Sequence, residues 1–378
     1  VGSIHIPIPI PIPMPIPMHK FIAHKHSFLS WQKDPILRET LERLSEIFLN
    51  ITELEPWNAL GDSEVIGVVD PLSGETFYNI FMGSMGTLFG IASYRGVLGY
   101  YCYKKAKSTS VLREQDEWHL QQNSILSTLE YPHEMYDDVR NTYQGYRIRL
   151  EDKKRHPSFI MYEPEFFPVI VSETKARSLL VVFEQILQVC NRLIRGDLTG
   201  IIKAKKIFCR VSSNEADGLV WRDSWQDVPD YVPEQLRFSE AAFTHFVKTQ
   251  DRVTRNGLTW EIDYFIQELP VVNDTGRSFF PRVLFIVDSQ SGFIFKTVMT
   301  ERSTFADKLL LALSEAIKEH GKPSAILVNR TELRDLLAQS GDWTKIDIEK
   351  RAKLPEIIKV KKEFQNLFKI DYYRKRTG

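Results

Sequence analysis

Residues 282–299, RVLFIVDSQSGFIFKTVM, decide the fold of the last third of this chain. The apolar β-rich runs 283–287 and 293–299 flank Asp288-Ser289-Gln290-Ser291-Gly292, whose small and polar residues favour a turn. Upstream, Trp260–Ile266 predicts another strand, with Asp263 near its middle. We therefore expect this part of the chain to begin with three consecutive strands.

Helices and strands then alternate to the end of the chain. Thr304–Glu319 carries apolar residues at helical spacing, and Gly321 and Pro323 after it are residues that end a helix. The rest of the pattern predicts a strand at 325–328, a helix at 331–339, a strand at 345–349 and a helix at 355–368 opened by a proline. Residues 236–378 are thus expected to form an α/β domain.

The predicted order, three antiparallel strands followed by α-β-α-β-α, is the ribonuclease H-like order. LFIVDSQSGFIF (284–295) resembles the second-strand hairpin of retroviral integrase and transposase cores. HGKPSAILVNRTEL (320–333) is similar to their Gly-x-Pro, strand, Asp-Asn-Gly-x-Glu segment. The resemblance covers residues 259–368 and implies a mixed sheet flanked by helices.

Enzymes of that class hold two divalent metals between carboxylates, because in-line phosphoryl displacement needs both oxygens neutralised. By position, Asp263 matches the first acid, Asn329 the second and Glu363 the third. Asn329 is neutral and offers one carbonyl oxygen, and Asp288 does not compensate for it. The resemblance therefore implies an incomplete acid set. The alternative is that Asp263 faces solvent or an arginine, Asn329 caps a helix, and Glu363 lies on the surface.

The 378 residues are 43% hydrophobic, enough for two domains, and the first two thirds predict an α+β domain at 21–235. Asp34-Pro35 predicts the start of a helix, and Ser172 precedes the strongest helical pattern in this part. The other predicted elements are strands at 64–69, 75–82 and 88–94, helices at 97–107 and 173–195, a hairpin at 207–225 that turns near Asp217-Gly218, and a connecting helix at 238–249 after Ser239.

His156–Pro168 is rich in aromatic residues and prolines. Such a segment can line a ligand groove. We favour the alternative that it is a rigid strap covering the sheet.

No catalytic motif stands out in this first domain. The glycines between 83 and 96 are not followed by Gly-Lys-Ser/Thr, so we expect turns rather than a phosphate loop. The histidines lack carboxylate or cysteine companions at metal-ligand spacing. These histidines are His24, His26, His119 and His133. We predict no cofactor and no metal.

Charge is balanced overall, with Lys+Arg and Asp+Glu both at 49, so no global positive field attracts nucleic acid. The C-terminus differs, because Lys345–Gly378 carries eleven basic and five acidic residues. Arg374, Lys375 and Arg376 are candidate nucleic-acid contacts. The alternative is a solvated helix and tail.

Cys102, Cys190 and Cys209 each lie in an apolar or aromatic stretch and predict reduced core thiols in a cytoplasmic protein. No apolar run approaches the roughly 18 residues that span a bilayer, so we expect no membrane partner.

Residues 6–18, IPIPIPIPMPIPM, lie within a low-complexity tail at 1–20. Proline at every second position forbids a helix and predicts an extended, polyproline-like segment. It is either a recognition peptide or, as we favour, an extension upstream of a start at Met18. Removing it should change the melting temperature by less than about 2 °C.

As a whole, the chain resembles a bacterial family of two-part proteins of unknown function, and three hypotheses follow. We favour a non-enzymatic binding or regulatory protein with a catalytically silent ribonuclease H-like domain and a protein partner. The second is a metal-dependent nuclease that uses Asp263, Asp288 and Glu363. The third is a nucleic-acid binder that uses the basic C-terminus.

Overall fold

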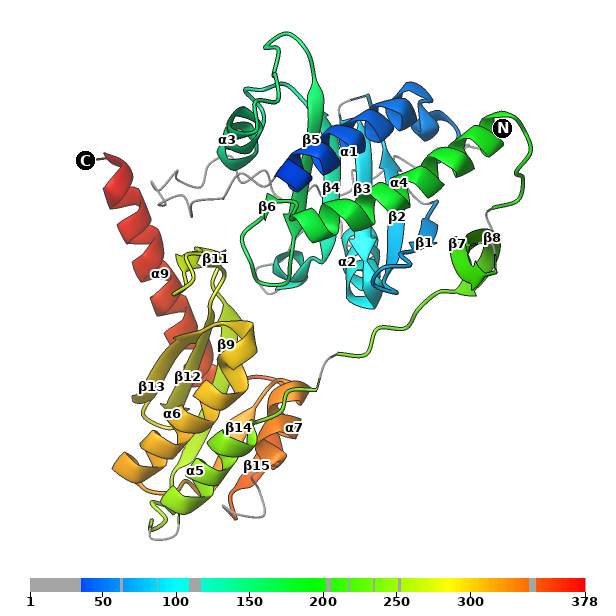
Figure 1. Cartoon of the computed structure of the whole chain (residues 1–378). Coiled ribbons are helices and arrows are strands. Elements are labelled where there is room, and N and C mark those ends of the chain that lie inside the picture. The colour runs from blue at the N-terminus through cyan, green and yellow to red at the C-terminus, as the bar shows by residue number, and fades with distance from the viewer. Residues whose placement is uncertain are drawn as a thin grey trace, which may run out of the picture. The chain divides into compact units, whose positions relative to one another are not determined.

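The computed structural model describes residues 35–377 apart from 62–63, 87, 109–116, 202–204, 217, 234, 251–252 and 340–344. The chain forms two compact units (Figure 1). The first runs to Tyr231 and includes Asn273–Arg277, and the second comprises Val232–Val272 and Ser278–Gly378. The Ile/Pro tail, His24 and His26 lie outside the described residues.

An eight-stranded sheet forms the centre of the first unit, in the order β6-β5-β4-β3-β2-β1-β7-β8. Neighbouring strands are antiparallel, except that β1 and β7 are parallel. The strands are β1 (Ile66–Val69), β2 (Thr76–Met82), β3 (Gly90–Arg95), β4 (Ser124–Glu130), β5 (His156–Tyr162), β6 (Val169–Ile170), β7 (Lys206–Glu215) and β8 (Gly218–Asp227). The predicted hairpins β1–β2 and β7–β8 are present.

Helices cover both faces of this sheet, as the alternation along β2 shows. Phe77 belongs to the core that contains apolar residues of α1 and α4, whereas Tyr78 packs with tyrosines of α2. Helices α1 and α4 lie side by side across one face (Figure 1). The helices are α1 (Pro35–Glu53), η1 (Pro56–Asn58), α2 (Gly96–Ser108), η2 (Glu117–Gln121), α3 (Asp137–Gly145) and α4 (Glu173–Ile194).

The expectation that residues 156–168 form a strap over the sheet is wrong, because its first half is the strand β5 within the sheet. Pro157 misled the prediction, since a proline cannot donate to a strand ladder. It is tolerated because β6 pairs with β5 only at Ile160 and Met161, which leaves the Pro157 end of β5 at an edge. Strand β4 and helix α3 were not predicted.

A five-stranded sheet forms the second unit, in the order β13-β12-β9-β14-β15. Strand β12 is antiparallel to its neighbours β9 and β13, whereas β14 and β15 run parallel to β9. The strands are β9 (Thr259–Ile266), β12 (Arg282–Asp288), β13 (Ile294–Thr300), β14 (Ala325–Val328) and β15 (Asp347–Lys350), with a small unpredicted hairpin of β10 (Val271–Val272) and β11 (Ser278–Phe279). The predicted strand order along the chain is confirmed.

The helices of this unit are α5 (Glu240–Gln250), η3 (Arg302–Thr304), α6 (Phe305–His320), α7 (Thr331–Ala338) and α9 (Pro355–Thr377). The Ser239 hydroxyl accepts a hydrogen bond from Ala242 N at 3.2 Å, as predicted for a cap of α5. Both units combine helices with sheets, so the expectation of an α+β first domain and an α/β second domain is confirmed.

Side chains of β9 point alternately to the two faces of the sheet, and this alternation decides on which face the candidate site lies. Trp260, Ile262 and Tyr264 lie in the core beneath α6, whereas Phe265 packs in the core that includes Ile357 of α9. Because successive side chains of a strand point to opposite faces, Glu261 and Asp263 lie on the α9 face with Phe265.

Candidate functional site

Asp263 is a buried carboxylate in the middle of β9, and an arginine neutralises it. Arg330 Nε donates a hydrogen bond to Asp263 Oδ1 at 3.0 Å. Burial raises the pKa of Asp263, and the charge of Arg330 opposes that rise. The surroundings of Asp263 therefore agree with the alternative that it faces an arginine.

Arg330, which lies between β14 and α7, is held from several sides. Its Nη2 donates to the carbonyl oxygen of Tyr264 at 3.1 Å. Its guanidinium carbon lies 4.3 Å from the centroid of the Tyr264 ring, and its Nη1 is 3.8 Å from Glu332 Oε1. These contacts fix a permanently charged group beside Asp263.

Asn329, the residue matched to the second acid, directly follows β14 and precedes Arg330, whose side chain contacts Asp263. Strand β14 pairs with β9 at Leu327 and Glu261 and ends at Val328, so Asn329 lies just beyond the paired part of the strand. Asn329 Oδ1 is buried and has no hydrogen-bond partner among the described residues. The residue at the N-cap position of α7 is Arg330 rather than Asn329.

Asp288 and Glu363 do not join Asp263. In the β9–β12 pairing, Asp263 lies opposite Phe285 and Asp288 lies opposite Trp260. Trp260 and Asp263 are three positions apart in β9, and residues an odd number of positions apart in a strand point to opposite faces, so Asp288 lies on the other face of the sheet. Asp288 Oδ2 instead accepts hydrogen bonds from the amide and hydroxyl of Ser291 and closes the β12–β13 turn. Glu363 is exposed on α9.

The residues present do not fit a two-metal centre. Arg330 already neutralises Asp263, Asn329 is uncharged, and the other two acids lie elsewhere. Across the described residues, no three His, Cys, Asp or Glu side chains form a group that could hold a metal ion. Among those same residues, no helix is both long and apolar enough to cross a membrane.

Glu261 is a further acid on the α9 face that sequence reasoning missed. Its Oε2 accepts hydrogen bonds from the backbone amides of Glu356 at 3.0 Å and Ile357 at 2.9 Å, and so caps the first turn of α9. Burial raises the pKa of Glu261, although these two bonds favour its charged form. Pro355 at the start of α9 was visible in the sequence, but its distant capping partner was not.

The basic C-terminus is only partly open to structural description. Lys359 Nζ pairs with Glu356 Oε1 at 2.6 Å, and Lys361 Nζ lies 4.9 Å from the centroid of the Phe265 ring. Arg374, Lys375 and Arg376 belong to the backbone of α9, but their side chains are outside the described part. The candidate nucleic-acid contacts therefore stay a prediction.

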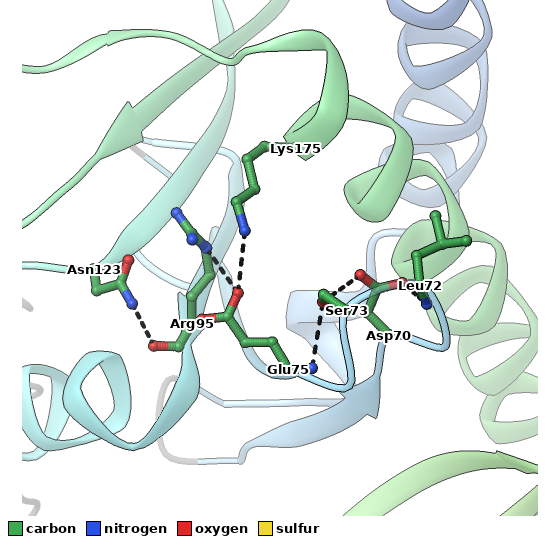
Figure 2. A network of polar contacts seen from close by, with 7 residues as sticks. All are labelled: Asp70, Leu72, Ser73, Glu75, Arg95, Asn123 and Lys175. Atoms are coloured by element: carbon green, nitrogen blue, oxygen red, sulfur yellow. Dashed lines mark hydrogen bonds and ion pairs between the residues drawn. The ribbon is translucent and has the colours of Figure 1, made fainter.

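The first unit contains a second polar cluster, which we call the Arg95 cluster and which comprises Glu75, Arg95 and Lys175. Glu75 Oε2 accepts from Arg95 Nε at 3.2 Å and from Lys175 Nζ at 3.4 Å (Figure 2). Glu75 directly precedes β2, Arg95 ends β3, and Lys175 lies in the first turn of α4. This cluster joins three elements that are distant in sequence.

The Arg95 cluster is held in place by a tight turn on one side and by Asn123 on the other. Buried Asp70 accepts from Leu72 N at 3.0 Å and from the Ser73 hydroxyl at 2.6 Å, which shapes the turn that precedes Glu75 (Figure 2). On the other side, Asn123 and Arg95 exchange two bonds. Arg95 N donates to Asn123 O at 2.8 Å, and Asn123 Nδ2 donates to Arg95 O at 3.0 Å.

The fold and the polar sites thus define a protein of an α+β unit and an α/β unit, in which an ion pair with Arg330 occupies the first predicted acid position, Asp263. Residues 42–210 match the family described as a domain of unknown function (DUF7309), and residues 247–365 match the domain of unknown function DUF6930. The chain is therefore a two-domain protein built from two families of unknown function, as its resemblance implied. No curated protein matches the chain significantly.

Proposed function

We propose that the second unit is a ribonuclease H-like domain that has lost its metal chemistry and serves as a binding module. The observation that carries this proposal is the contact of 3.0 Å between Arg330 Nε and Asp263 Oδ1. A fixed guanidinium at the first acid position neutralises the carboxylate and repels a divalent cation.

The topology supports the domain assignment in this proposal. Numbered within the unit, the strand order β13-β12-β9-β14-β15 is 3-2-1-4-5, with the second strand antiparallel to the first. Along the chain, three strands followed by alternating helices and strands agree with the order that the resemblance implies. Asp263 in β9 and Asn329 directly after β14 are the positions at which the resemblance would put two acids of an active enzyme.

Manganese titration of the intact protein tests the proposal. We expect negligible Mn²⁺ binding by the wild type and by Asn329→Asp, because Arg330 still occupies the site in both. Asn329→Asp combined with Arg330→Met leaves two carboxylates and removes the guanidinium that pairs with Asp263, so it should bind Mn²⁺ with a Kd of about 1 mM. The matched control is Asn214→Asp combined with Arg334→Met, which makes the same changes at exposed positions and should not bind.

Two outcomes would overturn this reasoning. Tight Mn²⁺ binding by the wild type, with cleavage of DNA or RNA, would show an active nuclease. Absence of binding by the Asn329→Asp/Arg330→Met double variant, with the fold intact by circular dichroism, would show that Arg330 does not take the place of a metal.

The same proposal includes a cytoplasmic, bacterial protein with a protein partner. Cys102, Cys190 and Cys209 are all free and buried, which supports a reducing compartment. The resemblance to a bacterial family supports the source. Nucleic-acid binding through Arg374, Lys375 and Arg376 is tested separately, by neutralising all three and measuring salt-dependent retention on DNA and RNA.

A further inference from the structure

Arg95 is a buried arginine whose hydrogen-bonding capacity is only partly used. Its side chain is 7% exposed, and its Nε donates to Glu75. Its Nη1, in contrast, is buried and has no hydrogen-bond partner among the described residues. A buried donor of a charged group left unpaired is costly, so a partner for Nη1 is expected.

Lys175 brings a second positive charge to the same place. Its Nζ and Arg95 Nε donate to one oxygen of Glu75, and Figure 2 shows both nitrogens on the same side of that carboxylate. The cluster therefore holds two cations and one anion. Its remaining positive charge is not balanced within the cluster.

Helix α4 adds the field of its N-terminus. Lys175 is the third residue of this 22-residue helix, and the side chain of Ser172 at the N-cap position makes no capping hydrogen bond. Amides of a first helical turn lack intrahelical acceptors and favour a bound anion. The one acid in this first turn, Glu173, is engaged by Arg177 at 2.8 Å.

We infer that the Arg95 cluster is an anion site for a phosphate group, free or as a terminal monoester. Arg95 Nη1, Lys175 Nζ and the first-turn amides of α4 are its donors. A phosphate presents several acceptor oxygens and two negative charges to such a set. Glu75 orients the guanidinium through Nε, and its own charge keeps the affinity low.

A phosphate site and a purely structural ion pair predict different effects of the same substitution at Glu75. In Glu75→Gln, Arg95 and Lys175 lose their internal anion, so phosphate affinity should rise. If the cluster only held the fold together, the same change would lower stability and create no phosphate response. The two partly exposed residues Glu75 and Lys175 are therefore better test positions than buried Arg95.

Calorimetric titration of the intact protein with inorganic phosphate at pH 8 and constant ionic strength is the test. We expect a wild-type Kd of about 1 mM, about tenfold weaker binding by Lys175→Gln and about tenfold tighter binding by Glu75→Gln. The matched control is Lys206→Gln, which removes another lysine of the first unit paired to an acid, Asp227 at 2.9 Å. Its affinity should equal that of the wild type.

Titration with methyl phosphate distinguishes the two sources of the ligand. Competition between methyl phosphate and inorganic phosphate shows that the site accepts a terminal phosphate monoester as well as free phosphate, and failure to compete restricts the site to free phosphate. The inference is overturned if the wild type shows no saturable phosphate binding. It is also overturned if Lys175→Gln and Lys206→Gln bind equally well, or if Glu75→Gln does not bind more tightly than the wild type.

Discussion

Replacing Arg330 with methionine removes the partner of a carboxylate that is almost entirely buried. The Asp263 side chain is 7% exposed and that of Arg330 is 24% exposed, with Nε and Oδ1 3.0 Å apart. Loss of one partner of a fully buried ion pair costs about 3–5 kcal/mol. Because Arg330 is partly solvated, the ion-pair loss lies nearer about 2 kcal/mol, and the lost contact with the Tyr264 ring adds up to about 1 kcal/mol. We expect Arg330→Met to cost about 3 kcal/mol in total.

Hydrogen exchange in the intact protein measures this cost locally, from the protection of amides in β9 and β14. A local measurement is needed because two units need not unfold in one transition. The matched control is Arg334→Met on α7, whose arginine is half exposed and pairs with its neighbour Asp335, so it should cost less than about 0.5 kcal/mol.

A double-mutant cycle with Asp263→Asn isolates the pair. The asparagine still accepts from Arg330 but removes the buried charge, so the two changes should be coupled by about 1–2 kcal/mol. Equal costs for Arg330→Met and Arg334→Met, or strictly additive effects in the cycle, would refute the claim that this ion pair organises the site.

Three further outcomes are expected. Glu261→Ala leaves two amides of the first turn of α9 without acceptors and should cost about 2–4 kcal/mol, measured by local hydrogen exchange in α9. Glu261→Gln keeps an acceptor and should cost less than half of that. Equal costs for the two variants would contradict the capping role. Gly67→Ala places a methyl carbon 2.3 Å from Cys209 Sγ and should lower stability by about 1–3 kcal/mol, with partial recovery on adding Cys209→Ala; no recovery would show that the sulfur is not the obstacle. Burial raises the pKa of Cys190 to about 12 and that of Cys209 to about 11, so neither thiol should react with iodoacetamide in the folded protein at pH 8, and rapid labelling would contradict their burial.

Sequence patterns predicted the second unit closely, because its elements are long and strongly periodic. Strand β14 has the predicted bounds 325–328, and α6 differs from its predicted range by one residue at each end. In the first unit, β5 was misjudged because Pro157 is a poor strand residue unless the partner strand is short, and that condition depends on residues further along the chain.

The candidate site shows a similar division. Position along the chain pointed to Asp263 and Asn329, which lie in β9 and directly after its neighbouring strand β14. The second hypothesis grouped Asp288 with Asp263, but the face on which Asp288 lies depends on pairing with β9. Arg330 follows Asn329 directly, yet its contact with Asp263 depends on how β14 meets α7.

The order of helices and strands, and with it the α/β character of the second unit, was determined by the sequence alone, because backbone preference and hydrophobic period act over a few residues. Only the tertiary structure decided which charges meet. Glu261 caps a helix that starts 94 positions after it. Glu75 accepts hydrogen bonds from both Arg95 and Lys175, and Lys175 lies 100 positions after Glu75. The reason is physical: a buried charge is stabilised by whichever partners the packed fold brings within a few ångströms, and separation along the chain carries no information about that distance.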